Sequence, residues 1–379
     1  MKHTSMRILQ VNKLYYPWIG GVETVAQDIA EYFNGKDGVS VTNLVCQPRG
    51  KRRLDMVNGV ATYRAGSFGM ALGMPLSLDF FRLFRELAKD ADVIFLHHPF
   101  PPACIAYWLF GRKKKVVVWY HSDIVRQKLA KIPFIPFIRF VLARAEHIFV
   151  SNKALVKNSA LLRDFSEKCR VIYFGIDVKR FEETNELRRE MVTIQGTYGK
   201  PLVLSVGRLV YYKGFSYLIE AMKDVPANLL IVGKGPLKDI LQAEIKNMDL
   251  REKVHIIDSV PDLVPYYRAC DIFALPSCEP SEAFGIVQIE ALACGKPVVN
   301  TDLPTGVPEV SVDGVTGRTV KIRDSAALRG ALCEILSDRE EYRRFSENAL
   351  VEVAKRFTKE KFCAELGKYI LPLSSRISQ

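Results

Sequence analysis

Two carboxylates and two cations in the second half of the chain are spaced like groups that hold a charged, hydroxyl-bearing ligand. Glu282 and Glu290 flank the start of a predicted helix over Phe284–Cys294, and seven residues separate them. Arg208 and Lys213 lie five positions apart across another predicted strand-to-helix turn. A planar arginine fork and a lysine point charge can converge on one diphosphate, whereas carboxylates accept hydrogen bonds from hydroxyl groups. The four residues therefore predict a ligand with hydroxyls on both sides of a charged centre.

The start of that helix supplies a third part of the predicted site. The loop before it is broken by Pro276 and Pro280. Gly295 is placed to cap the helix, and Pro297 opens the next strand. The unpaired amides around Gly285–Val287, at the positive end of the helix dipole, would suit a phosphate. A nucleotide diphosphate-sugar has this layout, with sugar hydroxyls, a charged middle and ribose hydroxyls.

The segment 281–291 resembles the signature of the retaining glycosyltransferases of family 4, which have the two-domain GT-B fold. This resemblance implies that Glu282 contacts hydroxyls of the donor sugar and that Glu290 holds the ribose. It also implies that Arg208 and Lys213 bind the donor phosphates and stabilise the charge left on the departing nucleotide.

The resemblance extends along the whole chain. The other matching segments are Gly20-Gly21-Val22-Glu23, Gly207-Arg208-Leu209, Lys213-Gly214 and Gly233-Lys234-Gly235-Pro236. The donor-binding residues it implies are Gly20, Gly21, Gly207, Arg208, Lys213, Gly233, Gly235, Glu282, Ala283, Phe284, Gly285, Ile286, Val287 and Glu290. The chain departs from the family at Tyr173-Phe174, where Pro-Asn is usual, and at Thr305, where glycine is more frequent.

Three of the six histidines lie at predicted carboxyl ends of strands. His97 and His98 follow a strand over Val93–Leu96, and His121 follows a strand over Val116–Tyr120. In a doubly wound sheet this edge binds ligands, so we expect a functional role for His121. The resemblance places His121 beside the donor sugar and gives a catalytic set of His121, Glu282, Arg208 and Lys213. His97, His98 and Arg126 are expected near the acceptor, although either of the first two histidines would also serve as a structural residue.

The length of 379 residues and the alternation of strands with helices predict two domains built on parallel sheets. The predicted first domain spans residues 1–174 and is completed by a C-terminal helix over 359–379. The predicted second domain spans residues 175–358, and the polar stretch Lys179–Glu190 reads as the crossing between them. The expected fold class is α/β, of the GT-B type, with two doubly wound Rossmann-like domains facing across a cleft. The first would bind the acceptor and the second the donor.

Positive charge is concentrated in the first half of the chain. Residues 1–174 carry 26 Lys and Arg against 13 Asp and Glu, whereas the rest is nearly balanced. A basic face attracts nucleic acid, anionic lipid headgroups or a lipid-diphosphate acceptor, and a generally basic surface is the plain alternative. Basic and large apolar residues alternate over Arg126–Ala145, as in a segment on an anionic membrane. A packed helix with snorkelling cations explains that pattern as well.

The remaining composition predicts neither a cofactor nor a metal ion. Eight cysteines form no Cys-x-x-Cys pair, and no histidines have zinc spacing. Asp90-Ala91-Asp92 precedes its strand, so we predict a solvated turn there. The amino terminus lacks the apolar core of a secretory signal, and no apolar run is long enough to span a membrane. The expected location is the cytoplasm, with peripheral contact at the inner face of the cytoplasmic membrane.

The predicted activity is retaining, metal-independent transfer of a hexose from a nucleotide diphosphate-sugar to a hydroxyl of a lipid-linked or polysaccharide acceptor in cell-surface glycan synthesis. The segment His121–Lys128 is similar to bacterial surface-polysaccharide transferases, several of them mannosyltransferases that use GDP-mannose. Mannose is therefore the expected sugar, and UDP-linked hexoses remain open. Two alternatives are a sugar-nucleotide epimerase or phosphorylase of the same fold and a nucleic-acid-binding protein that uses the basic half.

Overall fold

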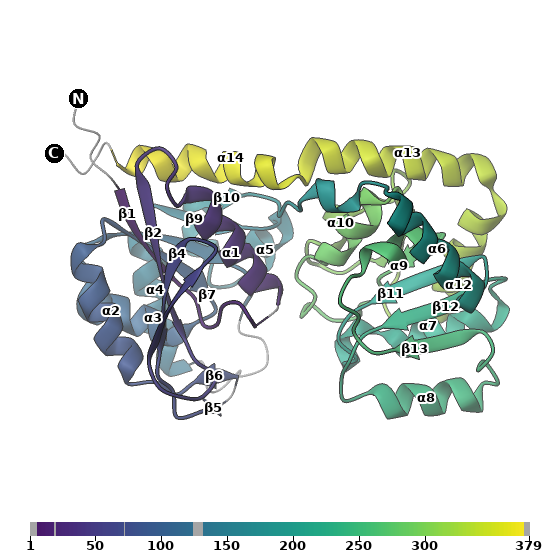
Figure 1. Cartoon of the computed structure of the whole chain (residues 1–379), viewed down its shortest axis with the longest axis horizontal. Coiled ribbons are helices and arrows are strands. Elements are labelled where there is room, and N and C mark those ends of the chain that lie inside the picture. The colour runs from purple at the N-terminus through teal and green to yellow at the C-terminus, as the bar shows by residue number, and fades with distance from the viewer. Residues whose placement is uncertain (1–5, 19, 72, 124–131, 375–379) are drawn as a thin grey trace. The chain divides into compact units, whose positions relative to one another are not determined.

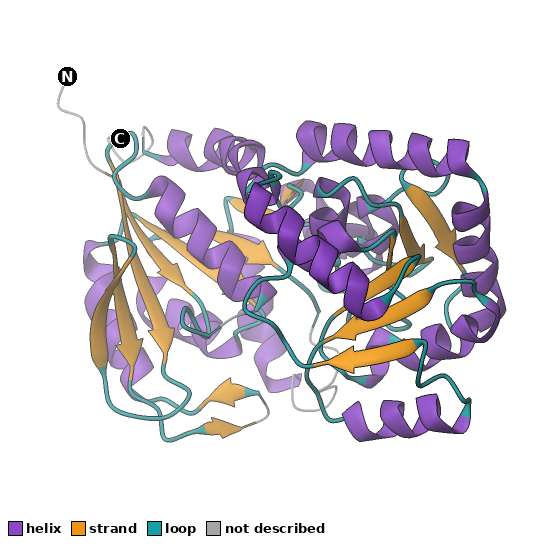
Figure 2. Ribbon diagram, turned by 45° about the vertical axis from the view of Figure 1, so that its right-hand side comes forward, coloured by secondary structure: helices purple, strands orange, loops and turns teal. Residues whose placement is uncertain are grey.

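The computed structural model describes residues 6–18, 20–71, 73–123 and 132–374 (Figure 1). The chain divides into two compact units, Met1–Tyr173 with Glu360–Gln379 and Phe174–Lys359. Each unit is a twisted sheet with helices on both faces, as Figure 2 shows. Within the described ranges, no helix combines the length and the hydrophobicity needed to span a bilayer.

The first unit contains an eight-stranded sheet of order β10-β9-β8-β7-β1-β2-β4-β3. Every pairing in it is parallel except that of β3 with β4. The strands are β1 (Met6–Val11), β2 (Val39–Cys46), β3 (Arg53–Val57), β4 (Val60–Ala65), β7 (Val93–His98), β8 (Lys115–Tyr120), β9 (His147–Val150) and β10 (Cys169–Val171). A separate hairpin joins β5 (Met70–Ala71) and β6 (Met74–Pro75). Strand order reverses between β1 and β7, and ligands bind at such switch points in doubly wound sheets.

Helices cover both faces of this sheet because successive side chains of its strands point in opposite directions. Leu44 packs in one cluster with Phe80 of α2, whereas its neighbour Val45 packs with Ala26 of α1. The helices are α1 (Gly21–Phe33), α2 (Asp79–Asp90), α3 (Pro101–Ala106), α4 (Ile135–Arg144) and α5 (Lys153–Asn158), and a π-helix spans Tyr107–Gly111. The C-terminal helix α14 (Lys359–Ile370) also packs here, with Phe362 edge-on to Trp119 at 5.4 Å between ring centroids.

The second unit contains a six-stranded, wholly parallel sheet of order β13-β12-β11-β14-β15-β16. Its strands are β11 (Leu202–Val206), β12 (Asn228–Val232), β13 (Val254–Ile257), β14 (Ile272–Ala274), β15 (Val298–Thr301) and β16 (Gly317–Val320). Its helices are α6 (Asn185–Tyr198), α7 (Phe215–Ala221), α8 (Lys238–Asn247), α9 (Val264–Ala269), α10 (Ile286–Ala293), α11 (Val307–Val310), α12 (Ser325–Ser337) and α13 (Arg339–Arg356). The switch point lies between β11 and β14, which are the strands that precede the two predicted ligand loops.

The α/β fold class is confirmed, and several local predictions were wrong. The polar stretch Lys179–Glu190 contains the start of helix α6, which the side chain of Thr184 caps by accepting a bond from the amide of Leu187. The helix expected over Phe284–Cys294 begins only at Ile286. Strands β3 and β16 were not predicted, because one is an exposed antiparallel edge and the other is a short strand with little apolar content.

Candidate active site

A buried ion pair joins the two loops at the switch point of the second unit. The ammonium of Lys213, after β11, lies 2.5 Å from a carboxylate oxygen of Glu282, after β14. The two residues are only 8% and 9% exposed. The hydroxyl of Ser277 donates to the same carboxylate oxygen at 3.1 Å. The structure thus brings together two residues that the sequence assigned to different parts of one ligand.

Arg208 differs from Lys213 although both belong to the loop after β11. Its side chain is exposed, and within the described part of the chain it has neither an ion pair nor a side-chain hydrogen bond. Lys213 carries a charge that Glu282 already balances, whereas the charge of Arg208 is uncompensated. The loop therefore presents a net positive charge through Arg208.

The glycines of this unit are explained first by contacts between loops. A Cβ at Gly233 would lie 1.9 Å from the carbonyl oxygen of Gly207, and one at Gly235 would lie 2.3 Å from that of Leu209. A Cβ at Gly207 would lie 3.0 Å from Cε of Lys213, so the missing side chain leaves room for the lysine stem. The family resemblance assigns these three glycines to donor binding. The structure gives them a further role in packing the loops after β11 and β12 together.

Helix α10 begins where the sequence predicts a phosphate site. Gly285 precedes it in the left-handed conformation, with φ of 74°, and a Cβ there would lie 2.7 Å from Leu275. The amides of Ile286 and Val287 are the first two of the helix. The ring of Phe284 is 3% exposed and stacks edge-on against Phe174, so its side chain belongs to the core. The carbonyl of Ala283, the remaining predicted residue of this loop, accepts a hydrogen bond from the amide of Gly306.

Glu290 lies one turn inside α10 and is held by a tyrosine that the sequence analysis missed. The hydroxyl of Tyr267, on α9, donates to its carboxylate at 2.6 Å. Burial raises the pKa of Glu290 above its usual range, and the bond from Tyr267 opposes that rise. Burial and the nearby carboxylate raise the pKa of Tyr267 well above its usual value, so it remains a neutral donor. Among the described residues, no side chain donates a hydrogen bond to the other carboxylate oxygen of Glu290, which is available to a ligand hydroxyl.

The three histidines expected at strand ends form one buried group in the first unit. His97 pairs in register with Trp119, so His121, two residues further along, lies on the same face. Nδ1 of His97 lies 3.0 Å from Nε2 of His121, and the rings stack at 5.3 Å between centroids. His98 stacks on Tyr120 at 4.3 Å, and its carbonyl accepts a bond from the amide of His121.

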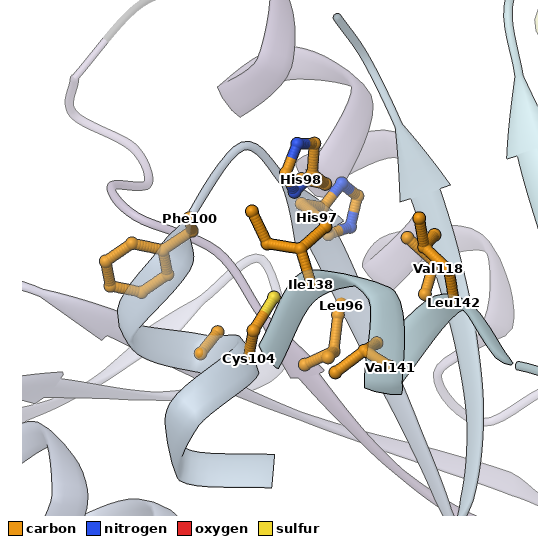
Figure 3. Close-up of a pocket in the computed structure, with 10 residues that line it drawn as sticks. Leu96, His97, His98, Phe100, Cys104, Val118, Ile138, Val141 and Leu142 are labelled. Carbon is orange, nitrogen blue, oxygen red and sulfur yellow. The ribbon is translucent and has the colours of Figure 1, made fainter. Parts of the chain in front are cut away.

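These histidines are uncharged at neutral pH. Burial lowers the pKa of His97 to about 3 and that of His98 to about 4. Burial and the neighbouring His97 lower the pKa of His121 well below its usual value. His97 and His98 also line a small pocket with Leu96 and Phe100, which Figure 3 shows. The group can therefore donate and accept hydrogen bonds, but it does not supply positive charge to a phosphate.

The glycine pair before α1 has a different environment. Gly20 precedes the helix in an extended conformation, and Gly21 is its first residue. A Cβ at Gly20 would lie 2.4 Å from a carboxylate oxygen of Glu23, which folds back over the helix start. Burial raises the pKa of Glu23. Arg126, predicted near the acceptor, lies outside the described residues.

No group of three metal-ligating side chains occurs among the residues described.

The sequence analysis missed two residues of this site, Tyr267 and Ser277, and they differ in how easily the sequence could have revealed them. Ser277 lies three residues after the end of the buried strand β14, where a polar residue suggests a site, whereas Tyr267 looks like an ordinary apolar position of a helix.

Comparisons with known proteins cover both units. The family described as "Glycosyltransferase Family 4" matches residues 19–180, and "Glycosyl transferases group 1" matches residues 188–351. The D-rhamnosyltransferase WbpZ of Pseudomonas aeruginosa is 30% identical over 93% of this chain and 92% of its own length. The O-antigen chain mannosyltransferase C of Escherichia coli is 28% identical over 93% of this chain and 95% of its own length.

The fold is shared with solved structures. Alr3699/HepE of Anabaena, solved in complex with UDP-glucose, superposes with a TM-score of 0.79 over 97% of this chain and 100% of its own, at 19% identity. At this identity the likeness shows the fold alone, which is GT-B.

Proposed function

The chain belongs to the group 1 and family 4 glycosyltransferases, and we propose that it transfers a hexose from a nucleotide diphosphate-sugar to an acceptor hydroxyl in cell-surface glycan synthesis. The acceptor is a lipid-linked or polysaccharide glycan, and the anomeric configuration of the sugar is retained. The names of the two bacterial relatives support this setting.

The observation that carries the proposal is the buried pair of Lys213 and Glu282 at the switch point. An ammonium has three N–H donors, so Lys213 can keep its bond to Glu282 and still donate to a phosphate. Glu282 retains lone pairs that can accept bonds from sugar hydroxyls. One pair of residues thereby fixes the distance between phosphate and sugar, which positions the anomeric carbon for reaction.

The leaving diphosphate is stabilised by Arg208, Lys213 and the amides at the start of α10. Arg208 supplies the uncompensated charge, and its planar fork suits two phosphate oxygens. The two cations neutralise the charge that develops on the diphosphate, so the proposal does not require a metal ion. The free oxygen of Glu290 accepts bonds from the ribose, while Tyr267 keeps the carboxylate oriented.

His121 is assigned to the reacting face of the sugar by the family resemblance. As a neutral imidazole it contributes hydrogen bonds rather than charge. Retention without an enzymatic nucleophile follows if the acceptor hydroxyl passes its proton to the leaving phosphate on the same face of the sugar. In that step the bond from the anomeric carbon to the phosphate oxygen breaks as the bond to the acceptor oxygen forms.

Mannose from GDP-mannose is the proposed donor, and the mannosyltransferase of Escherichia coli supports it. A UDP-linked hexose is the competing donor, because Alr3699/HepE, which shares the fold, was solved in complex with UDP-glucose. An epimerase would turn over the donor without an acceptor, and a phosphorylase would require free phosphate. Family membership favours transfer over both alternatives and over nucleic-acid binding.

We also propose peripheral contact with an anionic membrane through the π-helix Tyr107–Gly111. Its ends, Tyr107 and Gly111, are buried, whereas Trp108, Leu109 and Phe110 between them are 40%, 46% and 39% exposed. The basic run that begins at Arg112 follows directly. Exposed aromatic residues beside lysine and arginine are typical of a segment at a membrane interface. The segment expected for this role, Arg126–Ala145, lies partly outside the described residues.

A donor panel tests the proposal. The enzyme is incubated with GDP-mannose, GDP-linked rhamnose, UDP-glucose or UDP-galactose and a membrane extract containing acceptor, and release of nucleotide is measured with and without the extract. We expect acceptor-dependent release from GDP-mannose and an α-linked product by NMR. Release that does not depend on acceptor, or an inverted product, would contradict the proposed reaction.

A further inference from the structure

An apolar cavity of about 250 Å³ lies in the first unit, and none of the residues proposed for catalysis or donor binding lines it. Its wall comes from the end of β2, the loop before α2, the start of α2 and the segment after β7, and it includes Phe68, Leu78 and Phe100. Ser77 is the one hydroxyl in the wall, and it already donates to the carbonyl of Gly66 and accepts from the amide of Phe80. Burial raises the pKa of the Cys46 thiol to about 12, so that side chain is uncharged. The described wall therefore offers contacts to hydrocarbon and no unpaired side-chain hydroxyl that would recognise a sugar.

The rim of this cavity exposes an unusual amount of apolar surface. Phe68 is 77% exposed, Leu76 53% and Leu78 75%, and Met70 on the adjoining hairpin is 44% exposed. These side chains come from a stretch of eleven residues. Clustered apolar side chains at a surface mark an interaction site, whereas isolated ones do not.

Two free cations lie beside the same rim. Gly50 and Ser67 exchange backbone hydrogen bonds of 2.9 and 2.8 Å, which places the loop containing Gly50 against the segment that leads to Phe68. Arg49 and Lys51 flank Gly50, are exposed, and have no side-chain partner among the described residues. Arg52, the next residue, is instead bound by Asp79 and Glu86. An apolar cavity next to unpaired cations suits an amphiphile with an anionic head.

We propose that this cavity binds the hydrocarbon chain of a lipid-phosphate-linked acceptor, with the phosphate beside Arg49 and Lys51. The inference rests on the proposed function, because it identifies the lipid-linked class among the possible acceptors. Phe100 lines both this cavity and the pocket beside His97 and His98 (Figure 3). The hydrocarbon chain of the acceptor would therefore lie next to the histidine group of the same unit. A purely polar glycan acceptor would have no use for the cavity.

Isothermal titration of the full chain with a series of diphosphates tests the inference. The probes are inorganic diphosphate, which carries no hydrocarbon chain, and geranyl and farnesyl diphosphate, which share the same head and differ in the length of the chain. Each methylene that enters an apolar site strengthens binding about fourfold. We therefore expect affinity to rise along the series, by at least tenfold from inorganic to farnesyl diphosphate. Equal affinities for the three probes would overturn the inference.

Variants show where the hydrocarbon chain of the probe and its diphosphate head bind. Phe68→Glu and Leu78→Glu change side chains that are three-quarters exposed, and both should abolish the dependence on chain length. Because the new carboxylates lie near Arg49 and Lys51, they should weaken the binding of all three diphosphates, so the measured quantity is the ratio of affinities along the series. Val351→Glu in the second unit, 60% exposed, is the matched control and should keep that dependence. Joint replacement of Arg49 and Lys51 by serine should weaken farnesyl diphosphate at least fivefold. A chain-length dependence that survives in Phe68→Glu and Leu78→Glu would show that the chain binds elsewhere.

These experiments distinguish a failure of the lipid inference from a failure of the proposed transferase function. Binding of nucleotides is a property of Glu290 and its neighbours in the second unit, and the variants above do not touch them. If nucleotides bind and the chain-length series is flat, the lipid inference fails and the transferase proposal stands. If affinity rises with chain length and no nucleotide binds, the lipid inference stands and the transferase proposal fails.

Discussion

Lys213 and Glu282 show how a candidate ligand site can hold two buried charges. Burying two charges is unfavourable unless they are paired and hydrogen-bonded. Here the pair is completed by the hydroxyl of Ser277, and the missing side chain at Gly207 leaves space for the lysine stem. The pair keeps both residues in place before a ligand arrives, so binding does not have to order them.

Breaking this pair on one side should destabilise the second unit. Lys213→Met leaves a buried, uncompensated carboxylate, and we expect a loss of about 3–5 kcal/mol in the free energy of unfolding. The double variant Lys213→Met with Glu282→Gln removes both charges and should recover most of that loss. Urea unfolding followed by circular dichroism measures both.

The exposed pair of Lys238 and Asp258 provides the control for that prediction. Lys238→Met should change the unfolding free energy little, because exposed ion pairs contribute little. A Lys213→Met variant as stable as the control would contradict the structural role of the buried pair.

The histidine group predicts acid sensitivity of the first unit. In the folded protein the pKa values of His97 and His98 lie below the unfolded value of about 6.5. Between these pH values the unfolded chain therefore binds more protons than the folded chain does. Stability should therefore fall as pH drops below about 6.5, by about 1.4 kcal/mol per pH unit for each histidine, down to pH of about 4. Burial of these histidines in the neutral form therefore makes the first unit less stable in acid than at neutral pH.

His98→Phe isolates this contribution. The carboxylates are common to both proteins, so the difference in slope between pH 6 and 4.5 should be about 1.4 kcal/mol per pH unit. All three tryptophans, at positions 18, 108 and 119, belong to the first unit, and their fluorescence follows its unfolding in urea. Parallel slopes for the variant and the wild type would contradict burial of a neutral His98.

At the scale of elements, the loops of the second unit depend on close backbone contact. Gly233→Ala would place a Cβ 1.9 Å from the carbonyl oxygen of Gly207, so the loops after β11 and β12 must separate. We expect a loss of about 1–3 kcal/mol in stability and weaker nucleotide binding. Gly196→Ala is the matched control, since a Cβ there meets nothing within 4 Å, and it should stabilise α6 by about 0.5–1 kcal/mol. Equal effects of the two substitutions, measured by thermal unfolding, would refute the packing role.

The strands were the most predictable elements. Buried parallel strands read as continuous apolar runs, so the strands predicted over Val93–Leu96 and Val116–Tyr120 are found as β7 and β8, with ends that differ by at most two residues. Helix α6 was missed because its surface is largely polar, and its start is marked only by the cap at Thr184.

The residues of the candidate site could be selected from the sequence, but the contacts between them could not. Lys213 and Glu282 are 69 positions apart, and only the order of β11 and β14 in the sheet brings them together. The bond between His97 and His121 depends in the same way on the register of β7 with β8. Sequence spacing shows that these residues lie at strand ends, and tertiary pairing decides which of them touch.

At the scale of the whole molecule, the two family matches follow the two units, and positive charge gathers in the first. The first unit also carries the exposed aromatic π-helix and the apolar cavity. The two units therefore have different surfaces, and we propose that the first binds the acceptor and the second the nucleotide.

Replacement of Trp108 and Phe110 by serine tests the membrane surface. We expect the double variant to bind vesicles containing phosphatidylglycerol at least fivefold more weakly than the wild type, because interfacial binding depends on buried apolar area. Sedimentation with vesicles measures this, and added salt should weaken the wild type further. Leu350→Ser with Val351→Ser, on α13 of the second unit, is the control and should bind like the wild type. Equal binding by both double variants would remove the π-helix from the interface.

The measurement that tests the central claim most directly is thermal unfolding with GDP, UDP, ADP and dTDP in turn, for the wild type, Glu290→Gln and Tyr267→Phe. A nucleotide at about a hundredfold over its dissociation constant should add about 2.7 kcal/mol of stability. We predict that GDP stabilises the wild type and that Glu290→Gln loses most of this stabilisation. Tyr267→Phe should keep the stabilisation at neutral pH. As the pH is lowered, the variant should lose it at a higher pH than the wild type does. The last result follows because Tyr267 lowers the pKa of Glu290. If no nucleotide stabilises the wild type, or if Glu290→Gln responds as fully as the wild type, the second unit does not bind the donor as proposed.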